Sequence, residues 1–162
     1  MAWSTSRPFR ALLTDYLSGT ITWDLNAPSD SILAAWYDND ITPDADASSA
    51  NSAYNAGQWA TSGNEVSDTG GWAAGGRALD SVAVSNPSSL VVRLDAADEV
   101  SGTLSTGLTN YTGLLVYNGT AASPVADQGI CFNYLGSAQT TGAGGPVTVV
   151  FHANGLFQIT IT

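Results

Sequence analysis

The sequence of 162 residues contains no lysine, one cysteine, one histidine and few charged side chains of any kind. Four arginines stand against 14 acidic residues, which gives a formal net charge of −10. Binding to nucleic acid or to an anionic membrane depends on clustered cations, so we expect this chain to bind neither. With Cys131 as the single cysteine, an intramolecular disulfide is excluded, and with it the small secreted folds that disulfides hold together.

Long apolar runs are missing as well. No stretch approaches the roughly 20 apolar residues that a transmembrane helix requires. The first seven residues lack the charged and apolar regions of a signal peptide. We therefore expect a soluble protein that is made in a cytoplasm.

Motifs of known chemistry are also lacking, and we expect neither an enzyme nor a cofactor. His152 lies beside an Asn-Gly pair without a partnered nucleophile or acid, which is typical of a half-exposed strand residue. Cys131 lies in an apolar run and is expected to be a buried structural thiol. Neither a Gly-x-Ser-x-Gly element nor a phosphate-binding loop is present.

One acidic cluster, Asp38, Asp40, Asp44 and Asp46, could in principle supply oxygen ligands to calcium. The spacing differs from an EF-hand, because no glycine falls at the sixth position and no glutamate at the twelfth. The pattern therefore favours a solvated, turn-forming loop over a site for a divalent ion.

Residues 7–18 predict one short amphipathic helix. Its apolar side chains follow the 3–4 spacing of a single helix face and are Phe9, Leu12, Leu13, Tyr16 and Leu17. Ser6 suits the N-cap, Pro8 the first turn and Gly19 the C-terminal stop.

The rest of the chain predicts strands and turns. Residues 38–70 are expected to form a loop with a helical turn around 48–56. Alternating or continuous apolar runs predict strands over 20–25, 32–37, 77–84, 90–95, 111–117, 128–134, 146–153 and 156–162. Many short strands separated by glycine-rich turns favour a mainly β fold, an antiparallel β-sandwich or an open barrel with one N-terminal helix.

The last two predicted strands flank Asn154-Gly155, a pair that favours a type I′ hairpin turn. A two-residue loop there would place Val150 opposite Ile159 and His152 opposite Phe157. On the final strand, Phe157, Ile159 and Ile161 would share one apolar face.

Tryptophan is plentiful, with five residues. Trp23 and Trp36 lie in strand-like runs and are expected in the core. Trp59 and Trp72 lie in loop-rich sequence, where they either plug the ends of the sandwich or face a partner. Exposed tryptophan also stacks on sugar rings, so a carbohydrate-binding module is a rival class.

The chain divides into an N-terminal arm, residues 1–6, and a single β-rich domain, residues 7–162. Trp3 in the arm, with Arg7 and Arg10 just beyond it, could dock on a neighbouring subunit. The alternative, equally open, is that the arm folds over its own sheet.

Three stretches, residues 9–25, residues 64–76 and residues 127–134 together with 151–157, resemble a family of small bacteriophage virion proteins, especially from phages of actinobacteria. The most distinctive is Asn64-Glu65-Val66, followed by Trp72 and Gly75-Gly76. The resemblance implies a structural protein without catalytic residues. Its expected place is the virion, as a decoration or minor capsid protein on the outer surface of the major capsid lattice.

The same resemblance implies two partners, the major capsid protein and further copies of the chain, assembled as a homo-oligomer such as a trimer. The predicted contact residues are Trp3, Arg7, Arg10, Trp59 and Trp72, with residues 64–76 as a contact loop. A minor tail or tail-fibre module that meets the host surface, with or without bound glycan, is the alternative.

Overall fold

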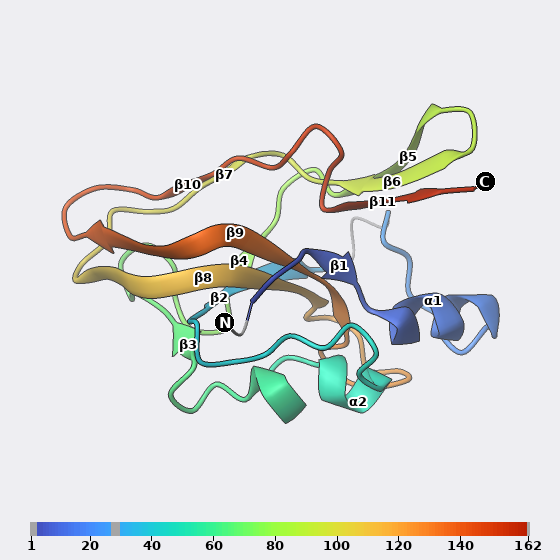
Figure 1. The fold of residues 1–162 in the computed structure, drawn as a ribbon, viewed down its shortest axis with the longest axis horizontal. Helices are drawn as coiled ribbons and strands as arrows, with labels where there is room; N and C mark the ends of the chain where they lie inside the picture. The colour runs from blue at the N-terminus through green and yellow to red at the C-terminus, as the bar shows by residue number, and fades with distance from the viewer. Residues whose placement is uncertain (1–2, 27–29, 162) are drawn as a thin grey trace.

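The computed structural model describes residues 3–26 and 30–161. It is mainly β, with antiparallel sheets and little helix, as the sequence predicts. Figure 1 shows a large sheet in the middle, smaller sheets on one side of it and short helices on the other. In the part of the chain that the structure describes, no helix is both long and apolar enough to cross a bilayer.

The large sheet contains two long strands that pair along most of their length. They are β8 (Gly107–Asn118) and β9 (Gly129–Gly142). The order across the sheet is β1-β9-β8-β2-β3, and β4 also pairs with β2. The shorter strands are β1 (Arg7–Pro8), β2 (Ile32–Tyr37), β3 (Glu65–Val66) and β4 (Arg77–Ala78). All pairings are antiparallel.

The second layer consists of two smaller sheets. One has three strands in the order β11-β6-β5, and the other pairs β10 with β7. Their bounds are β5 (Ala83–Ser88), β6 (Val91–Asp95), β7 (Glu99–Val100), β10 (Thr148–Val149) and β11 (Phe157–Thr160). Figure 1 shows these strands running above β8 and β9. The structure thus has two sheet layers, as in a β-sandwich.

Helix α1 (Arg10–Leu17) confirms the predicted N-terminal helix but starts later than its sequence suggests. Residues Arg7–Pro8 form β1 instead, so Ser6 is no N-cap, and Phe9 precedes the first turn without a capping side chain. Gly19 has a φ of 71° and ends the helix as predicted. Helix α2 (Ser49–Ser52) and a 3₁₀ turn η1 (Gly57–Trp59) cover the lower face of the large sheet.

Several predicted strands change length. Residues 20–25 form no strand, because Thr20 and Ile21 donate their backbone N–H groups to Asp15 at the end of α1. Residues 77–84 split into β4 and β5 around Ser81, which has a φ of 54°. The segment 146–153 contains only the short β10, and the end of the final segment, residue 162, lies outside the described residues.

The predicted C-terminal hairpin is wrong, and the turn beside it lies one residue earlier than predicted, with Ala153 and Asn154 at its centre. Gly155 has a φ of 73° and donates its N–H to the His152 carbonyl over 2.7 Å. The flanking strands nevertheless choose different partners, since β10 pairs with β7 and β11 pairs with β6. Phe157 lies opposite Leu94, an apolar neighbour that His152 would not have provided.

Trp36 and Tyr37 are consecutive in β2, so their side chains point to opposite faces of the large sheet. On one face, Trp36 packs against Trp72 and Tyr111 with ring centroids 5.3 and 4.7 Å away. On the other face, Tyr37 packs against Trp59 at 5.1 Å. Each face of this sheet is therefore filled by an aromatic cluster of the chain itself.

The predicted arm is part of this core. Trp3 is fully buried, lies 5.7 Å from Trp59 and 6.1 Å from Phe132, and donates its indole N–H to the Asp38 carbonyl over 2.6 Å. Of the two alternatives for the arm, folding over its own sheet is the one seen for Trp3. Residues 1–2 lie outside the described part of the chain.

Replacing Trp3 with alanine should therefore lower the free energy of unfolding by about 3–5 kcal/mol, because it removes a buried aromatic ring and leaves a cavity. Denaturant unfolding followed by fluorescence measures this loss. The control is Arg7→Ala, whose exposed side chain should matter by less than about 0.5 kcal/mol. Equal stability of Trp3→Ala and the parent chain would contradict the buried position of Trp3.

Candidate partner-binding site

The three-stranded sheet has one apolar face. Leu94 in β6 pairs with Val84 in β5 on one side and with Phe157 in β11 on the other. Two residues along, Val92 pairs with Ile159. Because side chains alternate along a strand, these five residues lie on the same face. The sequence had indicated this face in part, since Phe157 and Ile159 were predicted to share it.

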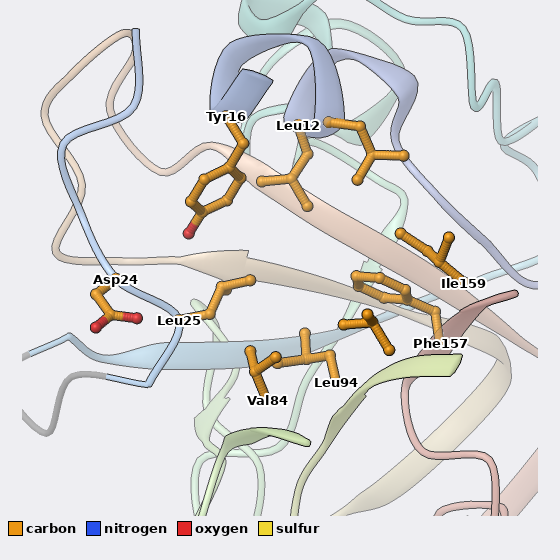
Figure 2. Close-up of a pocket in the computed structure, with 10 residues that line it drawn as sticks. Leu12, Tyr16, Asp24, Leu25, Val84, Leu94, Phe157 and Ile159 are labelled. Carbon is orange, nitrogen blue, oxygen red and sulfur yellow. The ribbon is translucent and has the colours of Figure 1, made fainter. Parts of the chain in front are cut away.

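Helix α1 covers this face only in part, and a groove of about 270 Å³ lies between the helix and the sheet. Figure 2 shows Leu12 and Tyr16 pointing from α1 toward the sheet, with Leu94 and Phe157 pointing back at them. The full lining is Leu12, Leu13, Tyr16, Asp24, Leu25, Val84, Val92, Leu94, Phe157 and Ile159. We call this lining the α1 groove.

Apolar side chains near the α1 groove remain open to solvent. Leu17, the last member of the predicted apolar stripe of α1, is 91% exposed. Ile161 continues the alternation of β11 and is 58% exposed, and Leu90, whose carbonyl accepts the Ile161 N–H, is 62% exposed. Val84 and Val92 in the lining itself are also exposed. Exposed apolar side chains beside an apolar groove are typical of an interaction site.

The α1 groove is acidic at one end. Asp24 lines it, and the Asp24 N–H donates to Asp30 Oδ2 over 3.1 Å, so the two carboxylates lie close together. Burial, together with the nearby Asp24 and Asp30 charges, raises the pKa of Tyr16 to about 12. The Tyr16 hydroxyl donates to the Trp23 carbonyl over 3.2 Å and stays protonated at neutral pH.

No known family model, curated protein or solved structure matches this chain. The site is therefore described from its own geometry. It can bury apolar side chains of a partner in the α1 groove and accept hydrogen bonds or a cation at Asp24.

Three of the five contact residues expected from the sequence need correction. Trp3, Trp59 and Trp72 are buried to at least 99% in the aromatic clusters of the large sheet, so their side chains offer no surface to a partner. The loop at 64–76 likewise keeps Trp72 inside, where its indole N–H donates to the Ala34 carbonyl over 2.9 Å. The sequence around Trp72 is rich in glycine and is followed by Arg77, so it did not indicate that Trp72 is buried.

Arg7 and Arg10 are exposed, as a contact role would require. The Arg7 guanidinium donates to the Thr5 hydroxyl over 3.3 Å. Arg10 lies 3.3 Å from the Asp46 carboxylate, and both side chains are more than two-thirds exposed. Their contact with a partner stays a prediction.

Two residues with possible chemistry are held in structural positions. Cys131 is fully buried in β9, and burial raises the pKa of its thiol far above the ordinary value. His152 is exposed and lies in no strand, which corrects the expected half-exposed strand position, and its Nδ1 accepts the Asn154 N–H over 3.1 Å. Neither lies in the α1 groove.

The acidic loop folds its carboxylates back on its own backbone. Asp38 accepts the Asp40 N–H and Asp44 accepts the Asp46 N–H, each over 2.9 Å. These contacts form turns, as expected, but the loop is solvated only in part, because Asp38 is 8% exposed. Within residues 3–26 and 30–161, no three side chains of His, Cys, Asp or Glu are grouped as metal ligands would be.

Asp68 is a structural centre that the sequence did not reveal. Its side chain is 3% exposed and accepts six hydrogen bonds. Oδ1 accepts the N–H groups of Gly70, Gly71 and Ser105 at 2.8 to 3.1 Å. Oδ2 accepts the Thr106 N–H and hydroxyl and the Gly107 N–H at 2.7 to 3.1 Å. The donors come from two loops far apart in the sequence, so only the fold brings them together.

Two further carboxylates act similarly. Glu99 is 2% exposed, lies 3.0 Å from Arg77 Nε and accepts the Asp80 N–H over 2.7 Å. Glu65 accepts the Tyr54 hydroxyl over 2.9 Å and the Gly75 N–H over 2.7 Å. These carboxylates stabilise loops and are not free to bind a partner.

Replacing Asp68 with asparagine should lower the melting temperature by several degrees, because an amide N–H would face donors that the carboxylate now satisfies. The backbone donors hold the pKa of Asp68 well below its ordinary value of about 3.9. Its contribution to stability is thus complete at neutral pH and is lost only as pH falls below about 4.

Unfolding curves measured from neutral to strongly acidic pH test this pH dependence of the contribution of Asp68 to stability. The stability difference between Asp68→Asn and the parent should be constant above about pH 4 and shrink below it. The matched control, Asp40→Asn, changes an exposed carboxylate and should leave stability unchanged. A difference that stays constant into strong acid would contradict the role of the ionised carboxylate.

Proposed function

We propose that this chain is a structural protein of a bacteriophage virion, a capsid decoration or minor capsid protein that binds the outer surface of the major capsid lattice and stabilises it. The observation that carries the proposal is the incompletely covered apolar face of β5, β6 and β11, exposed beside α1. Exposing an apolar face to water is unfavourable, and a neighbouring subunit that covers the face would remove this unfavourable free energy.

The sequence resemblance to small phage virion proteins supports the same conclusion. So does the use of carboxylates such as Asp68 and Glu99 to fix loops rather than to act on a substrate. The chain would be synthesised in the cytoplasm of the host bacterium and would reach its partner, the major capsid protein, on the capsid surface.

Repetition would make a weak contact sufficient. A capsid presents many identical sites, and a homo-oligomer of this chain, such as a trimer, would engage several at once. Each α1 groove then needs to bury only modest apolar area, at about 25 cal/mol per Å².

The alternative is a minor tail or tail-fibre module that contacts the host surface, and only its glycan-binding form depended on exposed tryptophan. Trp59 and Trp72 are buried, so they offer no stacking platform for a sugar ring. The capsid proposal needs no such platform.

The test uses phage particles produced without this chain, to which the purified protein is added. It should cosediment with the capsids and raise the temperature at which they release DNA. Val92→Asp, which places a charge in the α1 groove, should weaken binding at least tenfold, since desolvating a carboxylate costs more than one apolar contact gains. Circular dichroism verifies that the variant is folded.

Thr140→Asp is the matched control, because Thr140 is exposed in β9 on the large sheet, outside the groove lining. It should bind capsids like the parent. Finding the chain only on tails, or absent from mature particles, would overturn the proposed function.

A further inference from the structure

We propose that the α1 groove receives a partner segment with apolar side chains along its length and an arginine or lysine at the end where Asp24 and Asp30 lie. The identity of the partner as a capsid protein rests on the proposed function. The chemistry of the segment rests on the groove alone.

The lining divides into a long apolar part and one charged end. Apart from Asp24 and the Tyr16 hydroxyl, every residue in the groove lining is aliphatic or aromatic without a polar group. The Tyr16 hydroxyl is already bonded to the Trp23 carbonyl. Figure 2 shows Asp24 at one end of the groove, separated from Ile159 by the apolar side chains. A bound segment would therefore make apolar contacts along most of the groove and meet a carboxylate at one end.

This carboxylate pair has no cation from its own chain in the part that the structure describes. All four arginines are engaged or placed elsewhere: Arg7 bonds to Thr5, Arg10 pairs with Asp46, Arg77 pairs with Glu99, and Arg93 pairs with Asp95. Arg93 follows Val92 in β6, so its side chain points to the opposite face from the groove.

A second copy of this chain that docks groove to groove does not fit on charge. It would bring its own Asp24 and Asp30 to the interface, in a protein of net charge −10. Like charges that meet at an interface disfavour association. A segment that carries a cation turns the same carboxylates into a favourable contact and fixes the direction in which it lies.

Asp24 is exposed and Asp30 is half-buried, so their contribution is that of partly solvated ion pairs. Removing both charges should therefore weaken partner binding by about three- to tenfold, rather than abolish it. Added salt should weaken binding of the parent chain more than binding of the uncharged variant, because salt screens the ion pairs.

In the experiment, the full chain carries a photo-crosslinking phenylalanine derivative in place of Val92 and is produced during infection. Crosslinking is carried out in cells and in purified particles, and mass spectrometry identifies the crosslinked segment. The expected adduct is a segment with apolar residues and an arginine or lysine within a few positions. Asp24→Asn with Asp30→Asn should reduce the adduct yield by about three- to tenfold. Asparagine retains an acceptor oxygen for the backbone N–H that each carboxylate now binds.

The matched charge control is Asp40→Asn with Asp44→Asn, two exposed carboxylates of the acidic loop, which should leave the yield unchanged. The position control is the same crosslinker at Thr140, which should give no such adduct.

The outcomes separate this inference from the proposed function. An adduct to a capsid protein whose segment lacks a cation, or whose yield ignores the Asp24 and Asp30 variants, overturns the inference and leaves the function standing. An apolar and cationic segment from a protein outside the capsid, with the expected dependence on both carboxylates, upholds the inference and overturns the function. No adduct, or an adduct to a second copy of this chain, overturns the inference.

Discussion

The burial of aromatic rings on both faces of the large sheet is the constraint on which the rest of the structure depends. Trp36 and Tyr37 point to opposite faces of β2, and each requires its own set of neighbours. The chain supplies those neighbours from its loops and from its N-terminal segment, so Trp72, Trp59 and Trp3 are drawn inward. A residue of this size contributes about 3–5 kcal/mol when it is buried, which offsets part of the cost of ordering the loop that carries it.

Because the large sheet is covered on both faces by the chain's own aromatic residues, the binding surface that we propose lies on the small sheet. The face of β5, β6 and β11 is covered in part by the two turns of α1 and by Asp24 and Leu25, which follow the helix. The same helix leaves Leu17 in solvent at its C-terminal end. The incomplete cover thus follows from the length of one helix, which Gly19 ends.

The acidic residues divide into two groups with different tasks. The first group accepts backbone N–H groups and thereby fixes loops; its members are Asp68, Glu99 and Glu65. Asp24 and Asp30 lie at the groove, where no arginine of the chain pairs with them in the described structure. The first group thus stabilises loops, and the second is the group that we propose binds a cation of the partner.

The sequence predicted the elements whose signals are local. The helix stripe with Gly19, the apolar run of β2 and the mainly β class were all visible in short windows. Contacts between distant segments were not. Even the Asn154-Gly155 turn forms one residue earlier than predicted, and the strands beside it pair with Leu94 and other residues some 60 positions away. The burial of Trp72 and the six donors around Asp68 depend on such long-range contacts, and so does the groove.

The most direct measurement of the central claim is a high-resolution electron cryomicroscopy map of the intact particle. The account predicts that each copy of this chain lies on the capsid with its α1 groove filled by a neighbouring chain, and that a basic side chain of this neighbour reaches Asp24 or Asp30. A map in which the face of β5, β6 and β11 is open to solvent, while other surfaces of the chain hold it to the particle, would contradict the account.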